Sequence, residues 1–224
     1  MTKDSPEPCE TACPAVRPKG PRALRWKILG ALTIATFLVF IFLVHPFLAI
    51  TVRVPANILV VEGWIPDHML NDAANEFQNG GYSLLVISGL SITPRDSDQR
   101  YATDADRTAG RLQELGLVRE SILACPAPYT EWMRTYSTAC TVRDDLQAHN
   151  IAVTGINVLT AGPHARETWA AYHRAFRDRT PVGIISIPKK DYPASRWWAT
   201  VAGWRWVPKD FVAWLKEDVC GWFG

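Results

Sequence analysis

The chain has 224 residues, of which 48% are hydrophobic and 21% charged, with a formal net charge of +2 at pH 7. This length accommodates one sizeable domain with additional segments. The near-neutral charge gives no basic patch of the kind that nucleic-acid binding demands, so we expect no nucleic-acid partner.

The first 26 residues predict a disordered cytoplasmic tail. They are rich in proline and charge and show almost no apolar periodicity. Cys9 and Cys13 lie in this tail without neighbouring histidines. We therefore interpret them as reduced thiols rather than as metal ligands.

An apolar run follows and predicts a transmembrane helix over residues 27–50. No residue from Ile28 to Val44 is charged or strongly polar, and the run continues past His45 and Pro46 to Ile50. As a helix, residues 28–50 would extend about 34 Å, enough to cross a hydrocarbon core of about 30 Å. A buried core helix is the alternative, but the run has no polar face.

Flanking charge predicts the orientation of this helix. Only Arg53 follows the run closely, whereas five basic residues precede it: Arg17, Lys19, Arg22, Arg25 and Lys27. The positive-inside tendency then places the N-terminus in the cytoplasm and the main domain outside it. A cleaved signal peptide is disfavoured, because the run is too long and no small-x-small cleavage site follows. We predict a single-pass signal anchor.

The exported part contains an odd number of cysteines, Cys125, Cys140 and Cys220. In an oxidising compartment they allow at most one intramolecular disulfide, and the sequence does not select the pair.

From Asn57 onward, short apolar runs alternate with helical patterns. Helices are expected near residues 67–79, 101–115, 131–149 and 164–176. Strands are expected at 58–61, 84–87, 156–160 and 182–187, with a weaker one near 122–123. The runs are continuously apolar rather than alternating, which suits a parallel sheet buried on both faces. We predict a three-layer, Rossmann-like α/β domain over residues 54–196, with a mainly parallel sheet of about five strands.

Residues 197–224 form a tryptophan-rich C-terminal segment. One interpretation is an aromatic belt that rests on the membrane interface. We favour packing of a final amphipathic helix on the sheet, through Phe211, Trp214, Leu215 and Val219. Trp197 and Trp198 precede that helix and could instead border a ligand pocket.

Residues 156–169 carry the strongest functional signal. A short apolar run breaks at Ala161-Gly162-Pro163, and His164 and Arg166 follow at the start of a helical pattern. In open α/β sheets, ligands bind at this junction, at the carboxyl end of a strand. The start of a helix favours an anion, and a histidine transfers protons near neutral pH.

Three further segments deliver polar residues to the same expected edge. The first strand ends in Glu62, and the second ends in Ser88 and Gly89, whose missing side chain would let a ligand approach the backbone. Arg134 and Thr135 enter from the helix before the fourth strand. We predict His164 and Glu62 as catalytic residues, and the following as ligand-binding residues: Ser88, Gly89, Arg134, Thr135, Gly162 and Arg166.

Structural alternatives exist for each of these residues. His164 could cap its helix, Glu62 could be solvated or pair with Arg166, and Ser88-Gly89 could simply form a turn. The chain has no G-x-G-x-x-G and no G-x-x-x-x-G-K-[ST], and Ser88 does not lie in G-x-S-x-G. The chain has no H-x-H or H-E-x-x-H spacing, so we predict no metal site. The sequence does not identify a cofactor.

The order of these motifs resembles the YdcF/SanA/ElyC family of bacterial envelope proteins. The matching segments are Val60-Val61-Glu62-Gly63, Leu85-Val86-Ile87-Ser88-Gly89, Leu115-Gly116-Leu117, Arg134-Thr135-Tyr136-Ser137-Thr138-Ala139, and Val158-Leu159-Thr160 with His164-Ala165-Arg166. The likeness covers roughly residues 56 to 190. It departs from the family at Ser88-Gly89-Leu90, where Ser-Gly-Gly is common, and in having no glutamate immediately before Thr135.

This resemblance implies a Rossmann-like domain behind a membrane helix, with a role in peptidoglycan, polysaccharide or lipid-carrier metabolism. It does not imply a defined reaction. We expect a membrane-anchored protein on the periplasmic side of the bacterial cytoplasmic membrane, binding a phosphate- or sugar-bearing ligand at the strand edge. In this interpretation Arg166 binds the anion and His164 is a general acid or base. The alternative is a non-catalytic envelope-integrity scaffold or ligand sensor.

Overall fold

The computed structural model describes residues 21–91, 100–177 and 180–223. The chain divides into two compact units, Met1–Phe40 and Ile41–Gly224. Of the predicted disordered tail, residues 1–20 lie outside the described residues. Residues 21–26 form the first turns of a helix.

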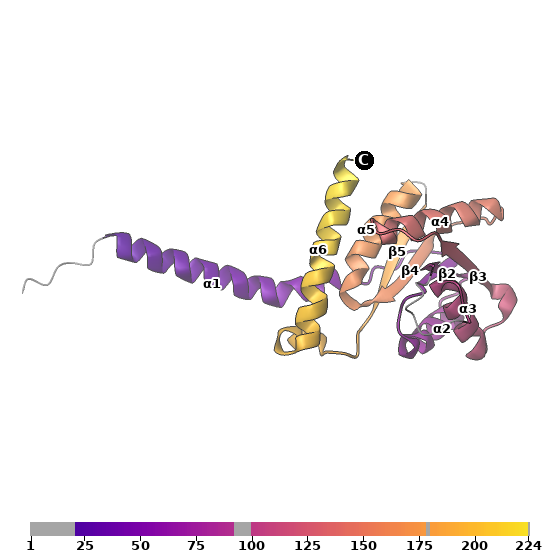
Figure 1. Ribbon diagram of the computed structural model, residues 1–224, viewed down its shortest axis with the longest axis horizontal. Coiled ribbons are helices and arrows are strands. Elements are labelled where there is room, and N and C mark those ends of the chain that lie inside the picture. The colour runs from indigo at the N-terminus through magenta and orange to yellow at the C-terminus, as the bar shows by residue number, and fades with distance from the viewer. Residues whose placement is uncertain (1–20, 92–99, 178–179, 224) are drawn as a thin grey trace, which may run out of the picture. The chain divides into compact units, whose positions relative to one another are not determined.

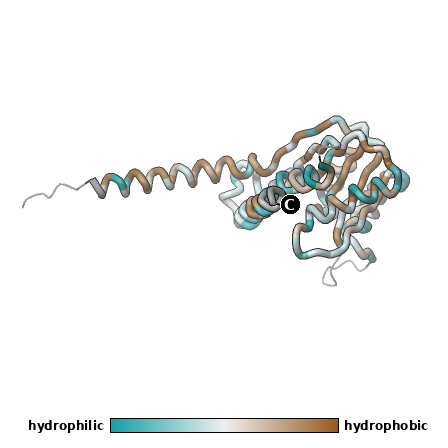
Figure 2. Tube along the Cα trace, turned by 90° about the horizontal axis from the view of Figure 1, so that it is seen from above, coloured by the Kyte–Doolittle hydropathy of each residue, from teal (hydrophilic) through white to brown (hydrophobic). Residues whose placement is uncertain are grey.

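The apolar run forms one long helix, α1 (Pro21–Leu48). It begins earlier than the predicted residue 27, and a proline suits the first helical position because its missing N–H would have no partner there. Figure 2 shows the hydrophobic colouring that dominates this helix. Among the described residues, Leu24–Leu48 is the one helix of 18 or more residues that is apolar enough to cross a membrane. By the criteria of helix length and apolar composition alone, a signal sequence near the N-terminus also qualifies.

The second unit contains a five-stranded sheet in which every strand pair is parallel (Figure 1). The strand order is β3-β2-β1-β4-β5. The strands are β1 (Ile58–Glu62), β2 (Leu84–Leu90), β3 (Ile122–Ala127), β4 (Ile156–Ala161) and β5 (Val182–Ile187). The predicted Rossmann-like fold with five parallel strands is confirmed.

Helices cover both faces of the sheet, because successive side chains of each buried strand point to opposite sides. On β1, Leu59 and Val61 pack with α2 and α3, whereas Ile58 and Val60 pack with α4 and α5. These helices are α2 (Leu70–Asn79), α3 (Asp104–Glu114), α4 (Arg134–Ala148) and α5 (Ala165–Phe176). Short 3-10 turns, η1 (Asp67–Met69), η2 (Arg119–Ser121) and η3 (Gly162–His164), precede α2, β3 and α5. The three layers are thus an α/β/α sandwich.

Helix α4 begins at Arg134, later than the predicted start near residue 131. Met133 has a φ of 50°, in the left-handed region that a helix cannot contain. The delayed start places Arg134 and Thr135 in the first turn of the helix.

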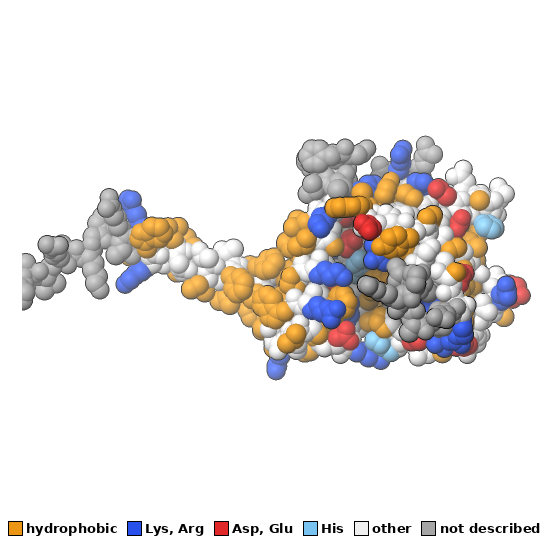
Figure 3. All heavy atoms as spheres, in the orientation of Figure 1, with side chains coloured by type: hydrophobic (Ala, Val, Ile, Leu, Met, Phe, Trp, Pro, Cys, Tyr) orange, Lys and Arg blue, Asp and Glu red, His pale blue; other side chains and the backbone are white. Residues whose placement is uncertain are grey.

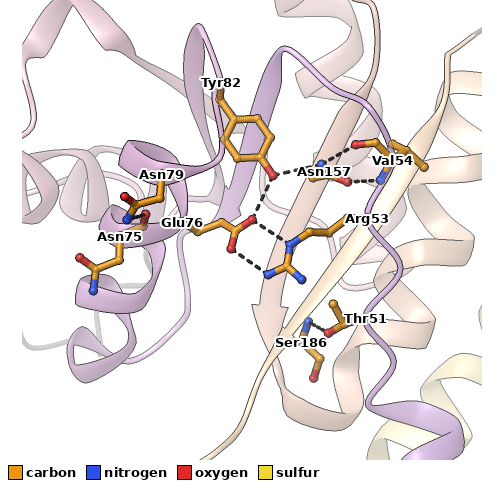
Figure 4. A network of polar contacts seen from close by, with 9 residues as sticks. All are labelled: Thr51, Arg53, Val54, Asn75, Glu76, Asn79, Tyr82, Asn157 and Ser186. Carbon is orange, nitrogen blue, oxygen red and sulfur yellow. Dashed lines mark hydrogen bonds and ion pairs between the residues drawn. The ribbon is translucent and has the colours of Figure 1, made fainter.

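The segment between α1 and β1 is fixed to the domain by a network of polar contacts (Figure 4). Val52 and Ile184 exchange both backbone hydrogen bonds in an antiparallel bridge. The buried Asn157 amide accepts from Val54 N and donates to Val54 O, both at 3.0 Å, and so replaces a strand partner. Arg53 forms two hydrogen bonds with the Glu76 carboxylate.

The C-terminal segment consists of η5 (Ala194–Ala199) and α6 (Val201–Phe223). Helix α6 packs on α5, not on the sheet as predicted, because α4 and α5 already cover that face. Phe211 and Trp214 join an apolar cluster with the last turns of α1, where Trp214 contacts Phe47 at a ring distance of 4.9 Å. Trp197 is buried in this cluster.

Candidate functional site

Parallel strands end at one edge of the sheet, and this places Glu62 beside Ser88 in register. Both side chains are buried. The Glu62 carboxylate accepts a hydrogen bond from the Thr160 hydroxyl on β4 and another from Thr168 on α5 at 3.3 Å. Glu62 is therefore a buried, hydrogen-bonded acid at the strand edge, and it does not pair with Arg166.

The His164 ring lies among three carboxylates. Its Nδ1 is 3.1 Å from Glu167 Oε2 and 3.8 Å from Asp210 Oδ1. Its Nε2 is 3.8 Å from Glu62 Oε2. The Trp64 ring stands edge-on to the imidazole, with centroids 5.0 Å apart. His164 makes no side-chain hydrogen bond that caps α5. Acids from three elements thus surround one imidazole.

These neighbours set the charge of the imidazole. Burial alone lowers the pKa of His164, but the Glu167 and Glu62 charges and a hydrogen bond with Asp210 outweigh it, so the pKa lies well above its usual value of 6.5. Burial raises the pKa of Glu62 despite the opposing charge of His164. Burial also acts on Glu167, but the His164 charge prevails and its pKa is lowered. The site therefore holds an imidazolium–carboxylate pair at neutral pH.

A cavity of about 330 Å³ opens beside this cluster. Six of the predicted site residues line it: Glu62, Ser88, Gly89, Arg134, Thr135 and His164. The remaining charged or aromatic residues of its lining lie outside the predicted set of catalytic and ligand-binding residues: Trp64, Asp104, Glu167, Lys189, Trp206, Lys209 and Asp210. The cavity lies at the carboxyl ends of the strands, where open α/β sheets bind ligands.

Lys189 follows β5 and reaches the wall of the cavity. Its Nζ lies 3.8 Å from the centroid of the Trp206 ring and 5.9 Å from that of Trp64. Such contacts hold an ammonium over the negative face of an aromatic ring. Burial lowers the pKa of Lys189, against the charges of Asp210 and Asp191. Its neighbour Lys190 is exposed.

Two predicted ligand-binding residues, Gly162 and Arg166, are not among the described residues that line the cavity. Arg166 is two positions after His164, so its side chain starts about 200° around the helix axis. Its guanidinium carbon lies 3.9 Å from the centroid of the Phe47 ring. Arg166 therefore contacts the end of α1 rather than the described lining of the cavity, and its anion contact stays a prediction.

Gly162 and Gly89 are glycines for structural reasons. Gly162 adopts a φ of 55° at the turn into α5, and its carbonyl accepts from Ser186 Oγ at 2.9 Å. Gly89 does line the cavity, but a Cβ there would lie 2.3 Å from Ala105 N at the start of α3. The missing side chain admits the backbone of α3.

Glu167 had a signal in the sequence that the prediction missed. It lies three positions after His164, and residues at this spacing share a helix face. Thr135 Oγ1 on α4 donates to Glu167 Oε1 at 3.1 Å. By contrast, the four lining residues of α6 come together with His164 only through the tertiary fold: Trp206, Lys209, Asp210 and Ala213.

A larger hollow of about 950 Å³ lies beside α2 and the segment before β1. Its polar residues Arg53, Glu76, Tyr82 and Asn157 are hydrogen-bonded to one another (Figure 4). Among the described residues, Ser88 Oγ and Asp210 Oδ2 of the His164 cavity are buried without a hydrogen-bond partner, whereas no buried side-chain atom of this hollow is. We therefore take the His164 cavity as the candidate site. Among the described residues, no group of three or more His, Cys, Asp or Glu side chains has the arrangement of a metal site.

Comparison with protein-family models and with curated proteins gives no match for the chain. The geometry of the cavity and the sequence motifs are therefore the basis for assigning a function.

Proposed function

We propose that α1 anchors the protein in the bacterial cytoplasmic membrane, with the α/β domain on the extracytoplasmic side. In this proposal the His164 cavity binds a phosphate- or sugar-bearing ligand of cell-envelope metabolism. The resemblance of the strand-end motifs to the YdcF/SanA/ElyC family supports the cell-envelope role. The chemistry of the cavity supports the class of ligand.

The observation that carries the proposal is that one cavity combines cations with buried acceptors. Lys189 is held against Trp206, and the Lys209 and Arg134 side chains line the same cavity. The first turns of α3, α4 and α5 also contribute to the lining, and helix starts favour anions. These groups suit a phosphate.

Buried carboxylates in the same cavity suit sugar hydroxyls. Asp210 Oδ2 is buried and accepts no hydrogen bond from the described residues. A buried acceptor left without a donor costs about 1–3 kcal/mol, so a ligand hydroxyl or a water would be stabilised there. A sugar phosphate offers both donors for Asp210 and an anion for Lys189.

Isothermal titration calorimetry of the full chain in detergent tests this ligand class, with a sugar 1-phosphate, the free sugar and inorganic phosphate as probes. We expect the sugar phosphate to bind most tightly. Lys189→Gln removes the fixed ammonium and should weaken sugar phosphate binding about tenfold or more, since hydrogen bonds to charged groups contribute about 1.5–3 kcal/mol.

Lys190→Gln is the matched control, because Lys190 is the exposed neighbour outside the lining. It should leave all three affinities unchanged. Equal effects of the two substitutions, or no binding of any probe, would contradict the proposed ligand class.

The second candidate function is a non-catalytic ligand sensor or scaffold. It is favoured because His164 contacts carboxylates, and no hydroxyl or thiol among the described residues is hydrogen-bonded to its ring. If the protein is an enzyme, the protonated His164 is the expected proton donor. Release of phosphate from the sugar 1-phosphate, lost in His164→Gln, would support the enzyme, whereas binding without release would support the sensor.

A further inference from the structure

The last two turns of α1 belong to the compact unit that begins at Ile41. Ile41, Val44 and Leu48 are buried there, with 8%, 4% and 0% of their surface exposed. These residues are also the end of the apolar stretch Leu24–Leu48 that is long enough to cross a membrane. Whatever covers them must therefore lie at the same depth as the end of the span.

The covering residues come from η5 and α6. Trp197 Nε1 donates to Ile41 O at 3.0 Å, and this indole is 1% exposed. The Trp198 ring packs edge-on against Phe42, with centroids 4.7 Å apart. These contacts fix the short η5 turn to the end of α1.

The length of the span gives the depth of this contact. The 25 residues Leu24–Leu48 form a helix about 36 Å long. When a hydrocarbon core about 30 Å thick is centred on this helix, its boundary lies about 3 Å before Leu48 along the helix axis. Ile41 lies seven residues before Leu48, about 10 Å along the helix. The bond from Trp197 to Ile41 is then about 7 Å below the hydrocarbon boundary.

The outward side of the same segment has the composition of a membrane interface. Val201 is 88% exposed and Trp204 is 45% exposed, with the indole N–H of Trp204 bonded to Trp198 O at 2.8 Å. Arg196 and Arg205 are exposed beside them. Tryptophan is enriched at the membrane–water boundary, and arginine there attracts anionic headgroups. Figure 3 shows Lys and Arg side chains next to hydrophobic ones over this part of the domain.

We propose that residues 194–205 form an interfacial segment that lies in the lipid leaflet at the Leu48 end of α1. The apolar side chains of Val201 and Trp204 enter the boundary between headgroups and hydrocarbon, and Arg196 and Arg205 contact lipid phosphates. The proposal rests on the proposed membrane span of α1 and is independent of the ligand of the His164 cavity. The partner is the bilayer, and contact with another protein is an outcome that the test distinguishes.

Depth-dependent fluorescence quenching of the full chain tests this placement, in vesicles of phosphatidylcholine and phosphatidylglycerol. Subtracting the emission of Trp204→Phe from that of the wild type isolates Trp204 among the ten tryptophans of the chain. With brominated acyl chains, Trp204 should lose most of its emission, and aqueous iodide should leave that emission unchanged.

Trp132→Phe is the matched control, since Trp132 is 77% exposed in the loop before α4. The emission of Trp132 should be lost to iodide and not to brominated lipid. If Trp204 behaves like Trp132, the segment faces water. If neither quencher reaches Trp204, a protein covers it. Either result overturns the proposal.

Extraction with alkaline carbonate separates this proposal from the membrane anchor. Release of the wild-type chain would show that α1 does not span the membrane, and the interfacial segment would fail with it. Retention in the membrane, together with iodide quenching of Trp204, would overturn the interfacial segment alone. Sugar phosphate binding by Trp204→Phe should equal that of the wild type in every case.

Discussion

At the His164 imidazole, burial and charge act in opposite directions. Removing the ring from water favours the neutral form, but Glu167 and Glu62 favour the cation more strongly. The histidine was expected to titrate near neutral pH, as an isolated imidazole does. In the folded protein it is a cation at neutral pH, suited to donating a proton or binding an anion rather than accepting a proton.

This charge predicts a pH dependence of stability. The folded-state pKa of His164 is raised above its unfolded value of about 6.5. Its contribution is therefore complete below about pH 6.5 and is lost as the pH rises through the raised pKa. We expect the free energy of unfolding, measured by urea denaturation in detergent, to fall by about 1–3 kcal/mol over this alkaline range.

His164→Gln should remove this alkaline fall. His149→Gln is the control, because His149 is exposed at the end of α4 and lies outside the cavity. It should keep the wild-type profile. An unchanged profile in His164→Gln would show that the imidazole does not carry the charge we assign to it.

At the scale of elements, the segment before β1 gains its order from side chains far away in sequence. Asn157 on β4 satisfies the backbone N–H and C=O of Val54, and Tyr82 accepts a hydrogen bond from the same amide at 3.0 Å (Figure 4). Glu76 on α2 joins this network through Arg53 and through the Tyr82 hydroxyl. The network connects the end of the membrane-length helix to the sheet.

Asn157→Ala should therefore destabilise the domain. It leaves the two backbone groups of Val54 without their partner, and we expect the free energy of unfolding to fall by about 1–3 kcal/mol. Urea denaturation of the full chain measures this change. Asn75→Ala, an exposed asparagine on α2, should change stability by no more than about 0.5 kcal/mol. Similar losses in both variants would contradict the role of Asn157.

At the scale of the whole molecule, the proposed membrane topology follows from charge on either side of α1. Basic residues precede the helix, and the positive-inside tendency places them in the cytoplasm. Alkaline phosphatase fused after Gly224 should then be active, because this reporter folds only outside the cytoplasm, and a green fluorescent protein fused there should be dark.

The combined variant Arg22→Glu, Arg25→Glu and Lys27→Glu removes basic residues before the helix. We expect it to lower the phosphatase activity and to raise the fluorescence of the two fusions, because the orientation of α1 is then inverted or mixed. A matched variant, Lys189→Glu, changes charge within the domain and should leave the topology unchanged, since only residues close to the span orient it. An inactive phosphatase with a bright fluorescent protein in the wild type would reverse the proposed orientation.

Local pattern was enough to predict the fold. Continuous apolar runs identified the strands, because a strand buried on both faces needs apolar side chains at every position. The same reasoning located Glu62, Ser88 and His164 at one edge, since parallel strands end together. It failed for Arg166, where helical geometry turns a residue two positions from His164 away from the cavity. The i, i+3 rule would have selected Glu167 instead.

The apolar helix, the parallel sheet and the edge where polar residues meet could all be predicted from the sequence, because each depends on periodicity within a short segment. The packing of α6 on α5, which supplies Trp206 and Asp210 to the cavity, became evident only in the folded protein. The charge of His164 was decided in the same way, because it depends on carboxylates from β1, α5 and α6. Contacts between distant segments depend on which apolar surfaces remain uncovered after the sheet has formed, and no local pattern encodes that.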